Sequence, residues 1–211
     1  MLTLFTSGST DEPKTVTHSW DYIRKCANKS INEIGLTQTD RVLDVFPSNT
    51  IAHYTITALP SFLSGAEYVC ANFNPFTYTD IFNKVKPTYI ALIPKHLELL
   101  MGSKGFKNLD MSSVRYMVTG SAKIDQSFID AFRERGVQTV ANWYGMTEVP
   151  PPIMIGYNSP KFTIVDENIR FADDGECIVD GWATGDVFDR SSMTFSHRKK
   201  EVNGSTWKTN I

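Results

Sequence analysis

The sequence predicts an α/β protein: a mostly parallel sheet with helices on both faces, followed by a small β-rich subdomain. Through residue 149, β-branched and aromatic runs alternate with stretches whose apolar residues recur every three or four positions. Such alternation implies right-handed crossovers and a parallel sheet. After Pro150–Pro152 the runs become short, alternating and separated by turn residues. We therefore expect an α/β domain over 1–149 and a β-rich subdomain over 150–211.

The first elements are two short strands and a helix. Leu2–Phe5 and Thr15–Thr17 are expected to be strands. The helix begins near Ser19 and ends at Gly35, because glycine accepts the left-handed conformation that closes many helices. Its apolar stripe consists of residues at three- and four-residue spacing: Ile23, Cys26, Ala27, Ile31 and Ile34.

Four helical patterns and five strand patterns follow along the chain. The expected strands are Arg41–Pro47, Glu67–Ala71, Thr88–Pro94, Val114–Gly120 and Val137–Trp143. The expected helices are Ala52–Ser64, Asp80–Val85, His96–Met101 and one over Ile124–Phe132 that closes at Gly136. In such sheets ligands bind beyond the carboxyl ends of the strands. Three polar motifs fall there, namely TSGST after the first strand, GSA after Val114–Thr119 and YGMTE after Val137–Asn142.

Composition and charge exclude several classes of protein. The 211 residues are 41% hydrophobic and 21% charged, which indicates neither disorder nor a fibre. A formal net charge of −2 gives no electrostatic signature for nucleic acid or a membrane surface. Cys26, Cys70 and Cys177 lack CxxC spacing, so we expect reduced thiols and a cytoplasmic protein. Signal-peptide and membrane-spanning patterns are also lacking.

The stretch TSGSTDEPK, from Thr6 to Lys14, has the chemistry of a phosphate-binding loop. Gly8 lets the backbone approach a ligand, the hydroxyls and N–H groups can donate hydrogen bonds, and Lys14 adds a positive charge. The spacing of the nucleotide-binding P-loop is absent, and ordinary turns have the same composition. Both interpretations of this stretch remain open on these residues alone.

Two further motifs offer nucleotide chemistry. In NWYGMTE, Asn142 carries an amide for a base edge, Tyr144 a stacking face, and Glu148 a carboxylate suited to Mg²⁺. Asp186, in the turn TGD, can accept hydrogen bonds from a ribose diol. An aromatic plug at a strand end and a plain β-turn are the structural alternatives.

Taken in order, the motifs TSGST…PK, GSA, NWYGMTE, TGD and HRK resemble those of the adenylate-forming superfamily. This superfamily contains acyl- and aryl-CoA synthetases, peptide-synthetase adenylation domains and luciferases. Its phosphate loop, (S/T)SG(S/T)TGxPKG, is matched except at two glycines, and its adenine motif, (N/D)xYGxTE, is met in full. Gly175–Glu176, Thr184–Asp186 and Arg198 follow in the family order, so the resemblance covers nearly the whole chain.

The resemblance implies a role for each matching residue. The ATP phosphates are held by Lys14 and by Thr6, Ser7, Gly8, Ser9 and Thr10. The adenine is flanked by Gly120, Ser121 and Ala122, bonded by Asn142 and stacked on Tyr144. Thr147 contacts the α-phosphate, Glu148 binds Mg²⁺, and Asp186 and Arg198 bind the ribose. Lys14, Thr147 and Glu148 are the catalytic residues of this assignment.

The implied reaction joins a carboxylic acid to AMP and then to a thiol, often CoA. His53 follows a Phe-Pro strand end and resembles the family's substrate-pocket histidine, although a histidine at a helix start is commonly structural. Relative to the family pattern, the long N-terminal region and the C-terminal lid with its lysine are missing, and Asp11 and Thr15 replace glycines. Asp11 and Glu12 place two carboxylates beside a triphosphate, which is unfavourable.

Two functions remain open from the sequence. One is a minimal AMP-forming ligase that makes or handles an acyl adenylate, with ATP or AMP, Mg²⁺ and CoA or a carrier thiol as its ligands. The other is a nucleotide- or acyl-adenylate-binding module without turnover, acting as a regulatory or structural part of an assembly. Surfaces that the missing regions would cover predict a homodimer, with no nucleic-acid or membrane partner.

Overall fold

The structure is a computed structural model that describes residues 1–6 and 14–199. Its centre is a seven-stranded sheet in the order β4-β3-β5-β6-β7-β8-β9. The strands from β4 to β7 in this order are parallel. Strand β8 pairs antiparallel with β7, and β9 pairs antiparallel with β8. The strands are β3 (Arg41–Asp44), β4 (Glu67–Cys70), β5 (Tyr89–Ala91), β6 (Tyr116–Gly120), β7 (Thr139–Tyr144), β8 (Met154–Tyr157) and β9 (Thr163–Ile164).

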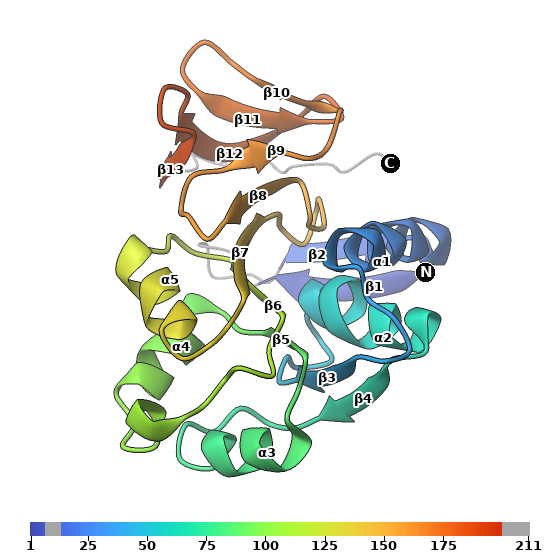
Figure 1. Ribbon diagram of the computed structural model, residues 1–211. Helices are drawn as coiled ribbons and strands as arrows, with labels where there is room; N and C mark the ends of the chain where they lie inside the picture. The colour runs from blue at the N-terminus through green and yellow to red at the C-terminus, as the bar shows by residue number, and fades with distance from the viewer. Residues whose placement is uncertain (7–13, 200–211) are drawn as a thin grey trace.

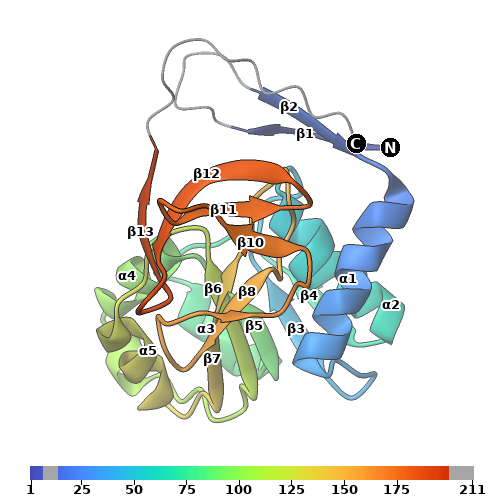
Figure 2. The same cartoon turned by 90° about the horizontal axis from the view of Figure 1, so that it is seen from above.

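Helices cover both faces of this sheet, which confirms the predicted fold class (Figures 1 and 2). Successive strand residues alternate between two cores, as period-2 geometry requires. One core joins Val42 and Tyr89 to the end of α1, and the other joins Leu43 and Ile90 to α3, α4 and α5. The helical segments are α1 (Trp20–Ile34), the π-helix η1 (His53–Thr57), α2 (Ala58–Ser64), α3 (Tyr78–Val85), α4 (Pro94–Met101), the 3₁₀-helix η2 (Phe106–Asn108) and α5 (Gln126–Arg133).

A second, four-stranded antiparallel sheet lies at one end of the large sheet (Figure 1). Its strands are β10 (Ile169–Phe171), β11 (Glu176–Val179), β12 (Trp182–Asp189) and β13 (Thr194–Arg198). The strands β8 and β9 pair with the large sheet even though they follow Pro150–Pro152. The large sheet thus continues past residue 150, and the division into domains at that position stays a prediction.

The first two strands form a separate hairpin, which Figure 2 shows set apart from the other sheets. In it β1 (Leu2–Thr6) pairs antiparallel with β2 (Lys14–His18). Leu2 and Leu4 pack against Ile23 of α1 and Ile51. The expectation that TSGST follows a strand of the parallel sheet is therefore wrong. A short connection lets neighbouring strands pair with each other antiparallel, whereas a parallel pair needs a longer crossover.

The ends of α1 agree with the sequence, while two later elements differ. Ser19 caps the helix by accepting a hydrogen bond from Tyr22 N, and Gly35 closes it with a φ of 64°. Strand β5 ends at Ala91, short of the predicted Pro94, because Pro94 begins α4. The expected helix over Ala52–Ser64 opens as a π-helix, a form common at functional sites. In the described part of the chain, no helix is long and apolar enough to cross a membrane.

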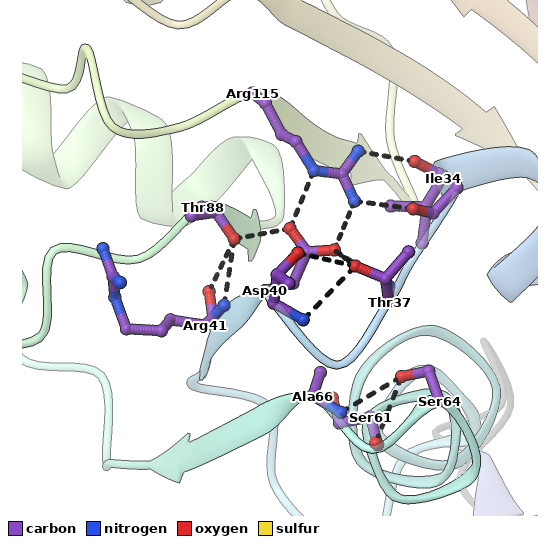
Figure 3. Close-up of polar contacts among 11 residues, drawn as sticks. Ile34, Thr37, Asp40, Arg41, Ser61, Ser64, Ala66, Thr88 and Arg115 are labelled. Carbon is purple, nitrogen blue, oxygen red and sulfur yellow. Dashed lines mark hydrogen bonds and ion pairs between the residues drawn. The ribbon is translucent and has the colours of Figure 1, made fainter.

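A buried carboxylate joins the end of α1 to the amino ends of three strands (Figure 3). Arg115 binds both oxygens of Asp40 at 2.7 Å, and Thr88 Oγ1 donates to Asp40 Oδ1 at 2.7 Å. Arg115 also donates to the carbonyls of Ile34 and Gly35. Burial by itself would raise the pKa of Asp40, but the hydrogen bonds from Arg115 and Thr88 outweigh it and lower the pKa to about 2.

His96 gives the fold a predictable sensitivity to acid. Its ring stacks on Phe73 with centroids 3.9 Å apart, and burial lowers its pKa to about 4. Unfolded chains bind this proton near pH 6.5. Between pH 6.5 and 4 the unfolded state therefore takes up a proton that the folded state does not, and stability falls as the pH falls. We expect this loss to be on the order of 1 kcal/mol for a half-buried ring.

The variant His96→Phe keeps an aromatic ring on Phe73 and removes the titrating group. Urea unfolding between pH 7 and pH 4 should show a smaller decline in the free energy of unfolding for this variant than for the wild type. His197→Phe, at an exposed position, serves as the control. An identical decline in His96→Phe and wild type would contradict the assignment.

Candidate active site

Six of the predicted site residues line one cavity of about 430 Å³. The cavity opens between the carboxyl ends of β6 and β7 and the strands β12 and β13, which belong to the two sheets seen in Figure 1. Its volume lies in the range of small-molecule sites. The six residues come from four separate segments and are Ser121, Ala122, Asn142, Tyr144, Asp186 and Arg198.

Two close backbone approaches shape the wall of this cavity. A Cβ on Gly120 would lie 2.3 Å from the carbonyl oxygen of Trp143, and one on Gly145 would lie 2.5 Å from the nitrogen of Pro151. Only glycine fits at either position without movement of the backbone. The predicted GSA and YGMTE motifs are thereby brought together where β6 and β7 end, as the sequence predicts.

A chain of three polar side chains forms the other side of the cavity. Asp186 is 3% exposed, and its carboxylate accepts from Arg198 Nε at 2.6 Å, Arg198 Nη2 at 2.9 Å and Tyr144 Oη at 2.9 Å. Burial raises the pKa of Tyr144, and the charge of Asp186 raises it further, so the phenol stays protonated and donates. The hydrogen bond with Asp186 raises the pKa of Arg198. Two of the three hydrogen bonds to Asp186 go to Oδ2 and one goes to Oδ1. A carboxylate has about four lone pairs, two on each oxygen, so one lone pair on Oδ1 stays available.

An apolar part of the wall was absent from the sequence prediction. Ile124, Phe162 and Phe195 line the cavity together with the predicted residues. The ring of Tyr144 also meets the edge of Phe188 at 4.9 Å and 84°, which holds it in place. Ile124 lies two residues after the GSA motif, and this proximity in sequence is a usable signal. Phe162 and Phe195 reach the cavity through tertiary pairing, which no local pattern indicates.

The phosphate side of the predicted site is described only in part. Thr147 and Glu148 lie in the loop after β7, half-buried and outside the lining of the cavity. His18 Nε2 lies 2.7 Å from the carbonyl oxygen of Thr147. Ser7, Gly8, Ser9 and Thr10 lie outside the described residues, and Thr6 and Lys14 are described only as the paired ends of β1 and β2. The phosphate-binding roles therefore stay predictions.

His53 lies apart from this cavity. It begins η1, and its Nδ1 lies 2.8 Å from Oδ2 of Asp44, which is fully buried at the end of β3. Asp44 also accepts from Tyr68 Oη at 2.7 Å and Phe46 N at 2.8 Å. A buried carboxylate thus holds His53 at the carboxyl edge of the sheet. Its role in a substrate pocket stays a prediction.

Metal binding by protein groups alone has no support within residues 1–6 and 14–199. In these ranges no three His, Cys, Asp or Glu side chains gather as a possible metal site. Mg²⁺ is commonly bound through one or two carboxylates together with substrate phosphates. A role for Glu148 in Mg²⁺ binding would therefore depend on a bound nucleotide.

A family model described as AMP-binding enzyme matches residues 1–175. The chain belongs to this family. Among curated members of the AMP-binding enzyme family, indoleacetate–CoA ligase from Aromatoleum aromaticum is 29% identical over 152 residues, covering 72% of this chain and 30% of that protein. Feruloyl-CoA synthase from an Amycolatopsis species is 26% identical over 160 residues, covering 73% and 31%. The chain thus spans about a third of the length of these relatives.

Solved structures of AMP-binding enzymes share the fold. The N-terminal domain of FACL13 from Mycobacterium tuberculosis superposes with a TM-score of 0.77 at 20% identity, covering 93% of this chain and 60% of that one. O-succinylbenzoate coenzyme A synthetase (MenE) from Bacillus subtilis, in complex with AMP, gives a TM-score of 0.73 at 19% identity, covering 93% and 49%. These likenesses confirm the α/β fold. The family model and the CoA ligase relatives confirm the predicted resemblance to adenylate-forming enzymes.

Proposed function

We propose that this protein is an AMP-forming carboxylic acid ligase-like protein that binds ATP or AMP and forms or handles an acyl adenylate. The observation that carries the proposal is the convergence of Ser121, Ala122, Asn142, Tyr144, Asp186 and Arg198 on one cavity. The sequence motifs assign these residues to adenine and ribose. The MenE structure of the same fold is described as a complex with AMP.

The chemistry of the cavity fits a nucleoside. Asn142 is 3% exposed and can both donate to and accept from a base edge. The ring of Tyr144, braced by Phe188, offers a fixed stacking face. Asp186, which accepts a hydrogen bond from Tyr144, keeps a lone pair for a ribose hydroxyl, and Arg198 holds the carboxylate in place. The base and the sugar would thus meet groups of the required polarity.

The proposed reaction needs orientation more than a protein nucleophile. The substrate carboxylate attacks the α-phosphorus of ATP, a P–O bond forms, and the bond to pyrophosphate breaks. Lys14 and Thr147 would hold the phosphates, and Mg²⁺ at Glu148 would neutralise their charge. Fixing two anions in line and screening their repulsion provides the rate enhancement. A thiol, such as CoA or a carrier thiol, would then form a C–S bond with the acyl carbon, and the bond from that carbon to AMP would break and release AMP.

The second candidate is a nucleotide- or acyl-adenylate-binding module with impaired catalysis, acting as a regulatory or structural part of an assembly. Asp11 and Glu12 in the phosphate loop favour it, because their charges oppose a triphosphate. They oppose AMP and acyl adenylates less, since these lack the β- and γ-phosphates. Tight AMP binding with weak ATP binding would distinguish this module from the ligase.

The expected partners are a small carboxylic acid and a thiol, by analogy with the CoA ligases among the relatives. We also propose a homodimer, since Phe62 and Phe76 are 82% and 87% exposed. A monomeric mass by light scattering would exclude the dimer.

Cys26, Cys70 and Cys177 are free thiols, which supports the proposed cytoplasmic location.

Calorimetric titration with AMP and ATP, each with and without Mg²⁺, tests the proposed function. The ligase requires Mg²⁺-dependent ATP binding and pyrophosphate release with a panel of carboxylic acids. Glu148→Gln removes one negative charge and should abolish the Mg²⁺-dependent part of both measurements while AMP binding persists. The matched control is Glu167→Gln at an exposed turn. Unchanged pyrophosphate release in Glu148→Gln would contradict the assigned role, and a wild type that binds no nucleotide would overturn the proposal.

A further inference from the structure

One hydrogen bond joins the N-terminal hairpin to the loop after β7 that contains the end of the adenine motif. His18 is the last residue of β2, and Thr147 lies 129 positions later in the loop after β7. The distance from His18 Nε2 to the carbonyl oxygen of Thr147 is 2.7 Å. A carbonyl oxygen can only accept, so Nε2 must carry the proton and donate. This requirement fixes which ring nitrogen is protonated.

The surroundings of His18 hold its ring in the donating orientation. The ring packs on Tyr22 of α1, with centroids 5.2 Å apart and planes tilted by 35°. Beside His18, the hairpin is anchored to α1 by the packing of Leu2 and Leu4 on Ile23. The imidazole is half-buried, and shielding from water strengthens such a bond. Thr147 is therefore bound by an element that is itself docked on the fold.

The acceptor loop is constrained from its other side. Met146 N donates to the carbonyl of Val149 at 2.9 Å, which closes the turn that contains Thr147 and Glu148. Gly145, just before this turn, is pressed against Pro151. The turn thus has a defined shape, and the contact with His18 sets its position relative to the hairpin.

We propose that His18 is a positioning residue that holds the Thr147–Glu148 turn in place relative to β2 and α1, so that the turn is ordered before it binds a nucleotide phosphate. This inference rests on the proposed function, since it concerns the phosphate side of the same site. Without the bond the turn would lose its fixed position, and a phosphate held by it would bind more weakly because the turn would have to be ordered on binding. The base and ribose cavity would be unaffected.

Binding measurements with adenosine, AMP and Mg²⁺·ATP separate the contribution of the phosphate side from that of the base and ribose cavity. His18→Phe keeps a ring over Tyr22 and removes the donor, and we expect AMP and Mg²⁺·ATP to bind about tenfold more weakly, the effect of one hydrogen bond. Adenosine affinity should change less than twofold. His18→Gln, which restores a side-chain donor, should recover most of the loss. The matched control is Thr17→Val, which removes the hydrogen bond of the neighbouring residue to Thr3 within the hairpin.

Equal losses for adenosine and AMP in His18→Phe, or no loss for either, would overturn the positioning role. A wild type that binds neither ligand would instead mean that the proposed function fails. In that case, nuclear magnetic resonance of ¹⁵N-labelled protein still tests whether His18 forms the hydrogen bond to Thr147. The inference requires a proton on Nε2 and, in His18→Phe, faster amide exchange at Thr147 and Glu148. An unprotonated Nε2, or unchanged exchange, would overturn it.

Discussion

Replacing Asp40 by Ala should lower the free energy of unfolding by about 3–5 kcal/mol, the cost of removing one member of a buried ion pair. Arg115 would lose both of its 2.7 Å hydrogen bonds to the carboxylate, and Thr88 would lose its acceptor. The end of α1 and the starts of three strands would lose their common partner. Urea denaturation at neutral pH measures the change.

An exposed ion pair provides the control for this prediction. Lys95 Nζ and Glu98 Oε2 are 2.8 Å apart, close to the 2.7 Å of the Asp40–Arg115 pair, but these side chains are 62% and 60% exposed. Glu98→Ala should therefore change stability by less than about 0.5 kcal/mol. The carboxylate of Asp40 also predicts acid sensitivity: its pKa is lowered to about 2, so its stabilisation is complete above pH 4 and is lost as the pH falls toward 2. Similar effects of the two substitutions would contradict the role of burial.

Asp186→Ala should weaken AMP binding on the order of a hundredfold, because a buried charged acceptor is removed from the proposed ribose site. Arg198, whose side chain is 61% exposed, would turn to water, so the fold should survive. Calorimetry measures the affinity, and thermal denaturation of the same sample verifies folding. Tyr144 would also lose its acceptor, which loosens the ring proposed to stack on the base.

Asp189→Ala is the matched control, since Asp189 ends the same strand but is exposed and bonds only to the following turn among the described contacts. AMP affinity should be unchanged in this variant. A folded Asp186→Ala protein with wild-type AMP affinity would show that no ribose site forms around this carboxylate.

Local signals in the sequence predicted much of the fold. Ser19 and Gly35 define the ends of α1 because capping depends on neighbouring residues. The end of β5 was placed too late, since β-propensity alone overlooked that Pro94 is suited to start a helix. The pairing of β8 with β7 was not foreseen, because strand pairing depends on contacts across the sheet. The ion pair of Asp40 and Arg115, 75 positions apart, has no local signature.

For the candidate site, residue chemistry was more predictable than residue contacts. Asn142, Tyr144 and Asp186 were singled out by motif, and the structure places them around one cavity. The hydrogen bond from Tyr144 to Asp186 was not predicted, although it leaves a single lone pair on the carboxylate. The hydrogen bond from His18 to Thr147 was also not predicted, because a polar residue at the end of a strand does not reveal its distant partner.

The cavity has one wall on each of two sheets, and this arrangement links ligand binding to sheet docking. Asn142 and Tyr144 belong to the large sheet, whereas Asp186 and Arg198 belong to the small one. A nucleotide that touched both walls would bind only when the sheets are together. By mass action it would favour that state by about 2.7 kcal/mol at a hundred times its dissociation constant. The ligand would thus act as a concentration-dependent clamp between two parts of the same chain.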